Sequence, residues 1–234
     1  MIDMAVILCL ETSSKNCSVA VSKDGETILL KEHFDENYCH GEQLHVLIEA
    51  LLKESGIDIS DFDAFGLSCG PGSYTGLRIG AASIKGFGFA LDKPILAIPT
   101  LKSMAHYVHN SKSIKLNKET LICPVLDSRK GEVYMSFYND LFKEYMGAFA
   151  CDLSSFSFDS YLDKYHMYFF GPGQYKLEFL SHPNACFLNG DYPSAEYLSP
   201  LAEEAFQNHN FVDIAYFEPM YLKDFIPTKS KKIY

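Results

Sequence analysis

The chain has 234 residues, 47% hydrophobic and 21% charged, enough for one large domain or two compact lobes and too apolar for a disordered or fibrous protein. It carries 20 Lys and Arg residues against 30 Asp and Glu residues, a formal net charge of −10. This balance excludes a protein that captures nucleic acid through an overall basic field, so any contact with RNA is expected to be local or made by a partner.

The first residues lack the basic stretch of a signal peptide, and no run approaches the roughly 18 apolar residues that a transmembrane helix needs. The seven cysteines are scattered, and no two of them form a CxxC pair. We therefore expect a soluble cytoplasmic protein with reduced cysteines and no membrane partner.

The first half begins with three strand patterns. Residues 4–10 form an unbroken apolar run, typical of a strand covered on both faces. Residues 17–22 and 27–33 flank a turn at Asp24-Gly25, which predicts a hairpin. A helix follows, ended by Gly56, with apolar residues spaced along one face at Leu44, Leu47, Ile48, Leu51 and Leu52. The pattern then predicts a strand at 63–69, a tight loop at 70–76, a helix at 77–91, a strand at 95–98 and a helix capped by Thr100.

Residues 110–119 shift to Lys, Ser and Asn, which indicates a boundary between an N-terminal lobe, 1–111, and a C-terminal lobe, 112–234. Pro200 is expected to interrupt the last helix, and no internal repeat is apparent. The tail carries Lys229, Lys231 and Lys232. The second lobe is predicted to hold strands at 121–126, 132–138, 144–150, 166–170 and 185–188, an amphipathic segment at 156–165 and a helix at 194–208.

Three strand-ending segments could carry chemistry. The first is Glu11-Thr12-Ser13-Ser14, whose hydroxyls and amides could hold a phosphate and whose carboxylate could orient a hydrated cation. An ordinary hairpin turn with self-satisfied Ser and Thr side chains explains this segment at least as well.

The second segment runs from Gly70 to Gly80, joining a buried strand to a helix where amides and the helix dipole favour an anion. It matches neither the dinucleotide fingerprint nor a Walker A loop. The glycines of the following helix, which include Gly80, Gly86 and Gly88, indicate close approach by another backbone. That neighbour could belong to the same chain or to a partner, and both alternatives stay open.

The third segment, from Asp127 to Tyr134, holds Arg129; with Arg78 in the second segment, these are the only two arginines of the chain. Both positions are consistent with a need for a planar cation that donates several hydrogen bonds. Structural ion pairs, such as Arg129 with Asp127 or Glu132, are the alternative.

The sequence predicts neither a catalytic residue nor a metal site. His40 and His45 are five residues apart, on different faces of a helix, and the pair His106 and His109 suggests no third ligand. The sequence has no GxSxG motif and no recognisable Cys–His pair.

Four stretches carry a resemblance to a known family: ILCLETSSKNCSVAVSKDGE, HGEQLHVLIEALLKESGIDISDFDAFGLSCGPGSYTGLRIGAASIKGF, DSRKGEVY and the C-terminal EPMYLKDF. They resemble the TsaB family of tRNA threonylcarbamoyladenosine biosynthesis proteins. The resemblance is dense over residues 5–135 and sparse over 136–215, and Glu11 stands where many members have Asp. It implies an α/β fold of the actin-like ATPase (ribonuclease H-like) kind, with two related lobes.

The resemblance also implies a function. Family members are non-catalytic partners of TsaD, a relative in the Gcp glycoprotease-like group that holds a metal through an HxxxH pair, which this sequence lacks. With TsaD and the ATPase TsaE they support transfer of a threonylcarbamoyl group to the adenosine beside the tRNA anticodon. A homodimer, tRNA contact mainly through TsaD, and ATP or ADP at the complex interface are further expectations; this chain itself is expected to need no cofactor. The alternatives are an independent phosphotransferase or ATPase and, least favoured, a metallopeptidase.

Two sets of site residues follow. The candidates for the partner interface are Leu44, Leu47, Leu51, Gly76, Gly80, Ser83 and Phe87. The candidates for phosphate or nucleotide binding are Glu11, Thr12, Ser13, Gly70, Gly72, Ser73, Thr75, Arg78, Asp127 and Arg129.

Overall fold

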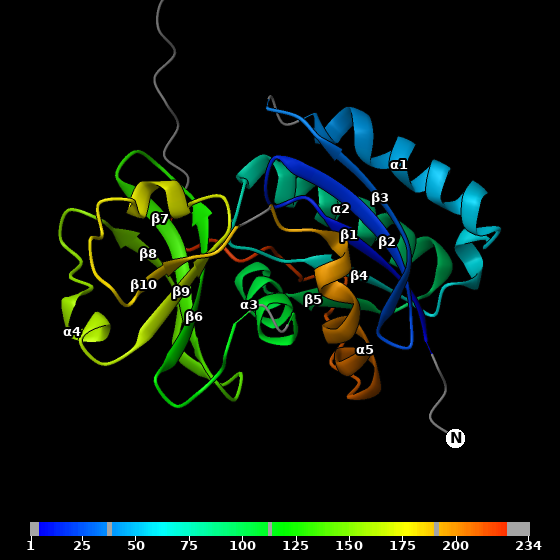
Figure 1. Cartoon of the computed structure of the whole chain (residues 1–234). Coiled ribbons are helices and arrows are strands. Elements are labelled where there is room, and N and C mark those ends of the chain that lie inside the picture. The colour runs from blue at the N-terminus through cyan, green and yellow to red at the C-terminus, as the bar shows by residue number, and fades with distance from the viewer. Residues whose placement is uncertain (1–4, 37–38, 112–113, 190–191, 224–234) are drawn as a thin grey trace, which may run out of the picture.

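A computed structural model of the chain describes residues 5–36, 39–111, 114–189 and 192–223 (Figure 1). The tail lysines 229, 231 and 232 lie outside these ranges. The strands are β1 Val6–Glu11, β2 Asn16–Lys23, β3 Glu26–Phe34, β4 Ala64–Ser68, β5 Ile95–Ile98, β6 Thr120–Asp127, β7 Glu132–Asn139, β8 Glu144–Asp152, β9 His166–Phe170 and β10 Ala185–Phe187. The α-helices are α1 His40–Ser55, α2 Tyr74–Leu91, α3 Thr100–Asn110, α4 Asp159–Leu162 and α5 Ser199–Gln207, with 3-10 turns η1 Ile59–Asp61, η2 Gln174–Leu177 and η3 Ala195–Leu198.

The strands form two five-stranded sheets of the same design. The first has the order β3-β2-β1-β4-β5 and the second the order β8-β7-β6-β9-β10. In each, the first three strands pair antiparallel and the last two join in parallel. The two halves of the chain therefore repeat one topology, which the sequence analysis did not recognise and which confirms the expectation of two related lobes.

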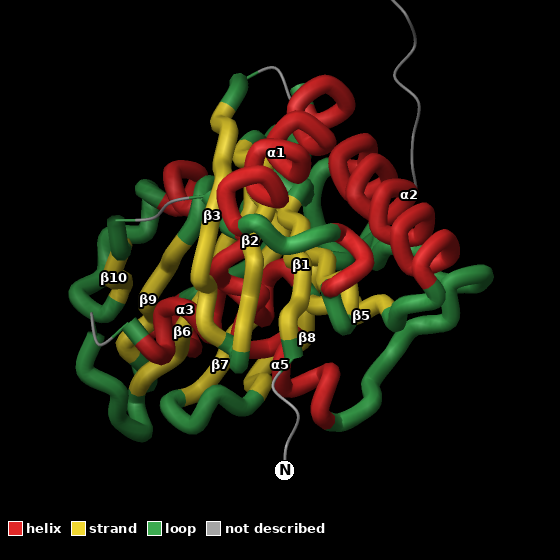
Figure 2. Tube along the Cα trace, turned by 90° about the vertical axis from the view of Figure 1, so that its right-hand side faces the viewer, coloured by secondary structure: helices red, strands yellow, loops and turns green. Residues whose placement is uncertain are grey.

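The first sheet is covered on both faces, which explains the unbroken apolar run of β1. Leu8 and Leu10 pack towards α1 and α2, whereas Ile7 and Cys9 pack towards η3 and α5. Figure 2 shows α1 and α2 lying side by side on one side of this sheet. The alternating orientation of strand side chains thus buries every apolar residue of β1.

The second sheet is covered by α3 on the face towards the first lobe and by α4, η2 and their loops on the other. Leu101, Met104 and Val108 of α3 pack on Ile122 and Leu126 of β6. On the opposite face, an aromatic cluster surrounds Phe137, and its other rings belong to Phe149, Phe156, Phe158, Tyr161 and Phe169. The molecule is thus layered as helices, sheet, helices, sheet and helices (Figure 1).

Two helices cross between the halves of the sequence. α3 comes from the first half and packs on the second sheet, whereas α5 comes from the second half and packs on the first sheet. The division of the chain at residue 111 stays a prediction. The packing shows that each sheet is covered by a helix from the other side of that division.

One local prediction needs correction and another is confirmed. Thr100 does not cap α3, because it is the first helical residue and Pro99 occupies the cap position. The interruption expected at Pro200 is confirmed, because the segment 194–208 is split into η3 and α5, with Pro200 in the first turn of α5. Pro is tolerated there because the first N–H groups of a helix have no partner within the helix.

Candidate functional site

A cleft of about 640 Å³ lies where loops at the carboxyl ends of the parallel strands of both sheets face one another. Ligands bind at such strand ends in open α/β sheets. The first lobe contributes the β1–β2 turn and the loop before α2, and the second lobe contributes the β6–β7 turn and the loop before η2. Residues 220–223 of the C-terminal segment complete the lining.

In the first lobe, the two loops are locked together by backbone contact. The Ser73 N–H donates to the Ser13 carbonyl oxygen at 2.6 Å, and a Cβ atom on Gly72 would lie 2.4 Å from that same oxygen. The Ser73 hydroxyl caps α2 by accepting from the Gly76 N–H at 3.3 Å. Only glycine fits at position 72, because any side chain would displace the turn.

The second lobe repeats this arrangement. The Gly173 N–H donates to the Val125 carbonyl oxygen at 3.1 Å, and a Cβ atom there would lie 2.6 Å from the carbonyl carbon of Leu126. Gly70 and Gly171 open the two loops with φ angles of +113° and +112°. The signal in the sequence is the repeated pattern GPG-x-Y, at residues 70–74 and 171–175, which the sequence analysis missed.

Glu11 lies behind the cleft and holds the β1–β2 turn in place. Its carboxylate is fully buried, and one oxygen accepts hydrogen bonds from the Ser13 N–H at 2.6 Å and the Ser68 hydroxyl at 2.8 Å. Burial raises the pKa of this carboxyl, and the hydrogen bonds oppose the effect. Its position indicates a structural role in joining β1 to β4, rather than direct contact with a ligand in the cleft.

The β6–β7 turn is organised by Lys176 of η2. Its ammonium group pairs with Asp127 at 2.5 Å and donates to the carbonyl oxygens of Ser128, Arg129 and Glu132 at 3.3, 2.9 and 3.0 Å. Glu132 pairs with Lys223 at 2.5 Å, which ties the C-terminal segment to the second lobe. The acidic residues considered as partners of Arg129 therefore pair with lysines.

Five tyrosines line the cleft together with basic side chains. The rings of Tyr74 and Tyr221 lie 5.0 Å apart, and the Arg78 guanidinium lies 5.0 Å from the Tyr74 ring centroid. The other three are Tyr134, Tyr175 and Tyr192, and the basic residues are Lys15, Arg129 and Lys223. Aromatic faces beside cations and loop amides can hold a base and an anion together.

The structure brings half of the predicted phosphate residues to the cleft. Ser13, Gly72, Ser73, Asp127 and Arg129 line it. The remaining five lie elsewhere: Glu11, Thr12 and Gly70 are buried behind the loops, and Thr75 and Arg78 are exposed on α2.

Four of the predicted interface residues belong to the interior of this chain. Leu44 and Leu51 are buried in the core beneath α1, and Gly76 and Gly80 are buried against Thr12. Leu47, Ser83 and Phe87 are half-buried and reach the surface. Of the two alternatives for the glycine-rich helix, packing within one chain therefore accounts for Gly76 and Gly80.

The comparison with protein families decides the relationship. The family model described as TsaD, tRNA N6-adenosine threonylcarbamoyltransferase, matches residues 37–157, just over half of the chain. The chain belongs to the TsaD family.

Among the described residues, no helix is long and apolar enough to cross a membrane.

Two curated relatives named tRNA threonylcarbamoyladenosine biosynthesis protein TsaB confirm the resemblance found in the motifs. The Haemophilus influenzae protein is 33% identical over 132 residues, which is 56% of this chain and 52% of the relative. The Escherichia coli protein is 31% identical over 135 residues, 56% of this chain and 54% of the relative. This TsaD-family chain thus spans about half the length of the curated relatives it matches.

A solved structure supports the fold over nearly the whole chain. YeaZ from Pseudomonas aeruginosa superposes with a TM-score of 0.78 at 26% identity, covering 94% of this chain and all of that one. Together with the two five-stranded sheets, this confirms the actin-like ATPase fold for this TsaD-family member.

Proposed function

We propose that this chain is a partner subunit of TsaD in the complex that transfers a threonylcarbamoyl group to the tRNA adenosine beside the anticodon. Membership of the TsaD family and relatives named for threonylcarbamoyladenosine biosynthesis support the proposal. The sequence has no HxxxH pair of the kind expected in catalytic relatives. We therefore assign the transfer chemistry to TsaD and a supporting role to this chain.

The observation that carries the proposal is an apolar outer surface on α1 and α2. The two helices run side by side (Figure 2). The His45 ring of α1 and the Ser83 hydroxyl of α2 share a hydrogen bond of 3.1 Å. Val46 on α1 is 56% exposed and Phe89 on α2 is 83% exposed. Phe side chains are enriched in protein interfaces, and we take these two exposed residues to mark one on the outer face of the helices.

Light scattering tests the assignment on this chain mixed with TsaD from the same organism. A 1:1 complex with wild type that weakens about tenfold or more in Phe89→Asp and Val46→Asp supports the proposal. Leu141→Asp is the control, because Leu141 is 68% exposed in the second lobe, away from α1 and α2. A chain that does not associate with TsaD overturns the proposal, and a dimer of this chain disrupted by the same two variants indicates that the surface also serves a homodimer.

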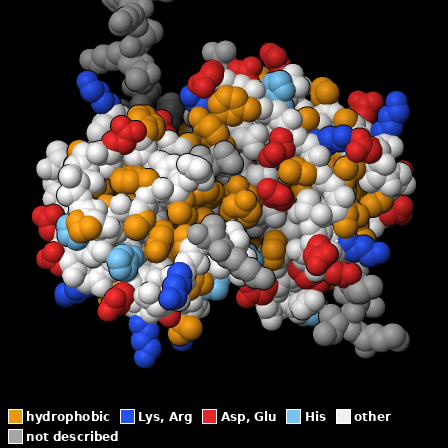
Figure 3. All heavy atoms as spheres, in the orientation of Figure 1, with side chains coloured by type: hydrophobic (Ala, Val, Ile, Leu, Met, Phe, Trp, Pro, Cys, Tyr) orange, Lys and Arg blue, Asp and Glu red, His pale blue; other side chains and the backbone are white. Residues whose placement is uncertain are grey.

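We also propose that ATP or ADP binds at the cleft when the complex is assembled, and that TsaE and tRNA join mainly through TsaD. Support comes from the tyrosines and loop amides of the cleft. Acidic side chains are interspersed with basic ones on the face shown in Figure 3, as expected when a partner makes most RNA contacts.

Equilibrium dialysis with ADP on this chain, on TsaD and on the mixture tests the nucleotide site. Enhanced binding by the mixture that Tyr74→Ala weakens supports a site at this cleft. Enhanced binding that Tyr74→Ala leaves unchanged places the nucleotide on TsaD.

A further inference from the structure

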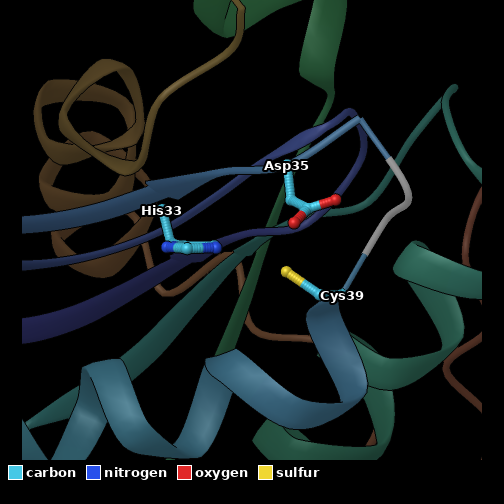
Figure 4. A group of neighbouring side chains, drawn as sticks. All are labelled: His33, Asp35 and Cys39. Atoms are coloured by element: carbon cyan, nitrogen blue, oxygen red, sulfur yellow. The ribbon is translucent and has the colours of Figure 1, made fainter.

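Three side chains of different chemistry meet where β3 ends and α1 begins. A ring nitrogen of His33, a carboxylate oxygen of Asp35 and the thiol sulfur of Cys39 all lie within 4.8 Å of one another. Figure 4 shows the three side chains pointing into the space between the end of β3 and the start of α1. The sequence analysis did not consider this group, because it searched for histidine pairs and CxxC pairs and not for mixed ligands from two elements.

The backbone explains why these residues converge. Side chains two residues apart on a strand share a face, so His33 and Asp35 point the same way. The Asp35 N–H donates to the Lys15 carbonyl oxygen at 3.3 Å, which extends the pairing of β3 beyond its last residue. Cys39 is the cap residue of α1, and its carbonyl oxygen accepts from the Glu42 and Gln43 N–H groups at 3.0 Å. Each side of the group is therefore fixed by an element of secondary structure.

We propose that His33, Asp35 and Cys39 bind a Zn²⁺ ion that joins the end of β3 to the start of α1. One nitrogen, one oxygen and one sulfur ligand suit Zn²⁺ and exclude Mg²⁺ and Ca²⁺, which prefer oxygen alone. On binding, the Cys39 thiol loses its proton to solvent and the thiolate sulfur bonds to the metal, while His33 binds as neutral imidazole. All three residues are partly exposed, so the ion reaches the site from solvent and water completes its coordination.

The proposed ion would also act on the cleft. The Lys15 carbonyl oxygen accepts the hydrogen bond from the Asp35 N–H. Lys15 also lines the cleft, and its side chain pairs with Glu36. Fixing Asp35 therefore fixes the backbone next to the β1–β2 turn. This proposal is independent of the proposed function, because it concerns only the binding of a metal by this chain.

Cobalt substitution tests the site on the full chain, freed of metal by a chelator and kept reduced. We expect one Co²⁺ per chain, with the near-ultraviolet absorption of a cobalt–thiolate bond, displaced by one equivalent of Zn²⁺. Cys39→Ser is expected to abolish the absorption, whereas Cys186→Ser, the other half-exposed thiol, retains it. His33→Gln and the isosteric Asp35→Asn are each expected to weaken Zn²⁺ binding about tenfold or more.

Circular dichroism confirms that each variant is folded before titration, and Asp35→Asn serves if Cys39→Ser fails this check. Failure of the wild-type chain to bind Zn²⁺ in competition with a micromolar indicator overturns the proposal. An unchanged cobalt–thiolate absorption in Cys39→Ser, or unchanged Zn²⁺ affinity in both His33→Gln and Asp35→Asn, overturns it equally.

Discussion

The carbonyl oxygen of Thr12 lies 2.0 Å from the position that a Cβ atom on Gly76 would occupy. One helical turn further along α2, a Cβ atom on Gly80 would lie 2.4 Å from the Thr12 hydroxyl oxygen. α2 therefore packs directly against the β1–β2 turn, and this close contact is possible only because glycines stand at these positions of α2. This close packing fixes the position of Ser13, which lines the cleft.

Gly76→Ala should destabilise the protein, because the added methyl group forces α2 and the β1–β2 turn apart. We expect a loss of about 1–3 kcal/mol in the free energy of unfolding, measured by urea denaturation. Gly86→Ala is the matched control in the same helix, since a Cβ atom there has no neighbour within 4 Å. That variant should gain about 0.5–1 kcal/mol from helix propensity. Equal effects of the two substitutions would contradict the close packing.

Glu11→Gln should flatten the pH dependence of stability. Burial raises the pKa of the Glu11 carboxyl above its ordinary value of 4.5, so the folded state favours the protonated form. Its contribution to stability is complete below pH 4.5 and is lost as the pH rises through the raised pKa. The variant stays neutral and should lose less stability than wild type between that pH and neutrality, as measured by urea denaturation at a series of pH values. Parallel profiles for wild type and variant would show that Glu11 does not titrate in this way.

Lys176→Met should loosen the β6–β7 turn, because it removes the donor shared by three carbonyl oxygens and the partner of Asp127. We expect a loss of about 2 kcal/mol and faster amide hydrogen exchange in the turn. Lys130→Met, in the same turn but with an exposed side chain, should change stability by less than about 0.5 kcal/mol. A comparable loss in both variants would mean that charge, rather than the shared donor, stabilises the turn.

Two of the seven thiols should react with a disulfide reagent faster than the other five, because they are more exposed. Cys39 and Cys186 are half-exposed, whereas the other five are buried. Burial raises the pKa of Cys9 to about 12 and that of Cys69 to about 11, which keeps these thiols protonated and slow to react. A stoichiometry above two in the fast phase, counted by absorbance in native buffer, would show that the core opens readily.

The apolar pattern of α1 predicted the helix correctly, but two of the three leucines chosen from it as interface candidates, Leu44 and Leu51, pack in the core. Leu44, Ile48 and Leu51 recur at helical spacing because they pack on the first sheet, which is the commonest reason for such a pattern. The exposed Val46 lies outside that stripe. Periodicity alone does not reveal an isolated apolar residue on the outer face, so Val46 was identified only from the structure.

The pairing of β1, β2 and β3 followed from local signals, since short turns join these three strands. The long-range packing of the helices did not follow from local signals, because no local sequence pattern indicates which sheet a helix will cover. The relationship between the lobes was readable in the two GPG-x-Y segments, residues 70–74 and 171–175. Short glycine motifs carry this information because their backbone geometry tolerates few other residues.

The crossing of α5 has a consequence during synthesis. When the ribosome has made β1 to β5, the face of that sheet formed by Ile7, Cys9, Leu96 and Ile98 still lacks the helix that covers it. That helix emerges only after the whole second sheet has been translated. The nascent N-terminal half therefore exposes this apolar surface to solvent until residue 207 leaves the exit tunnel.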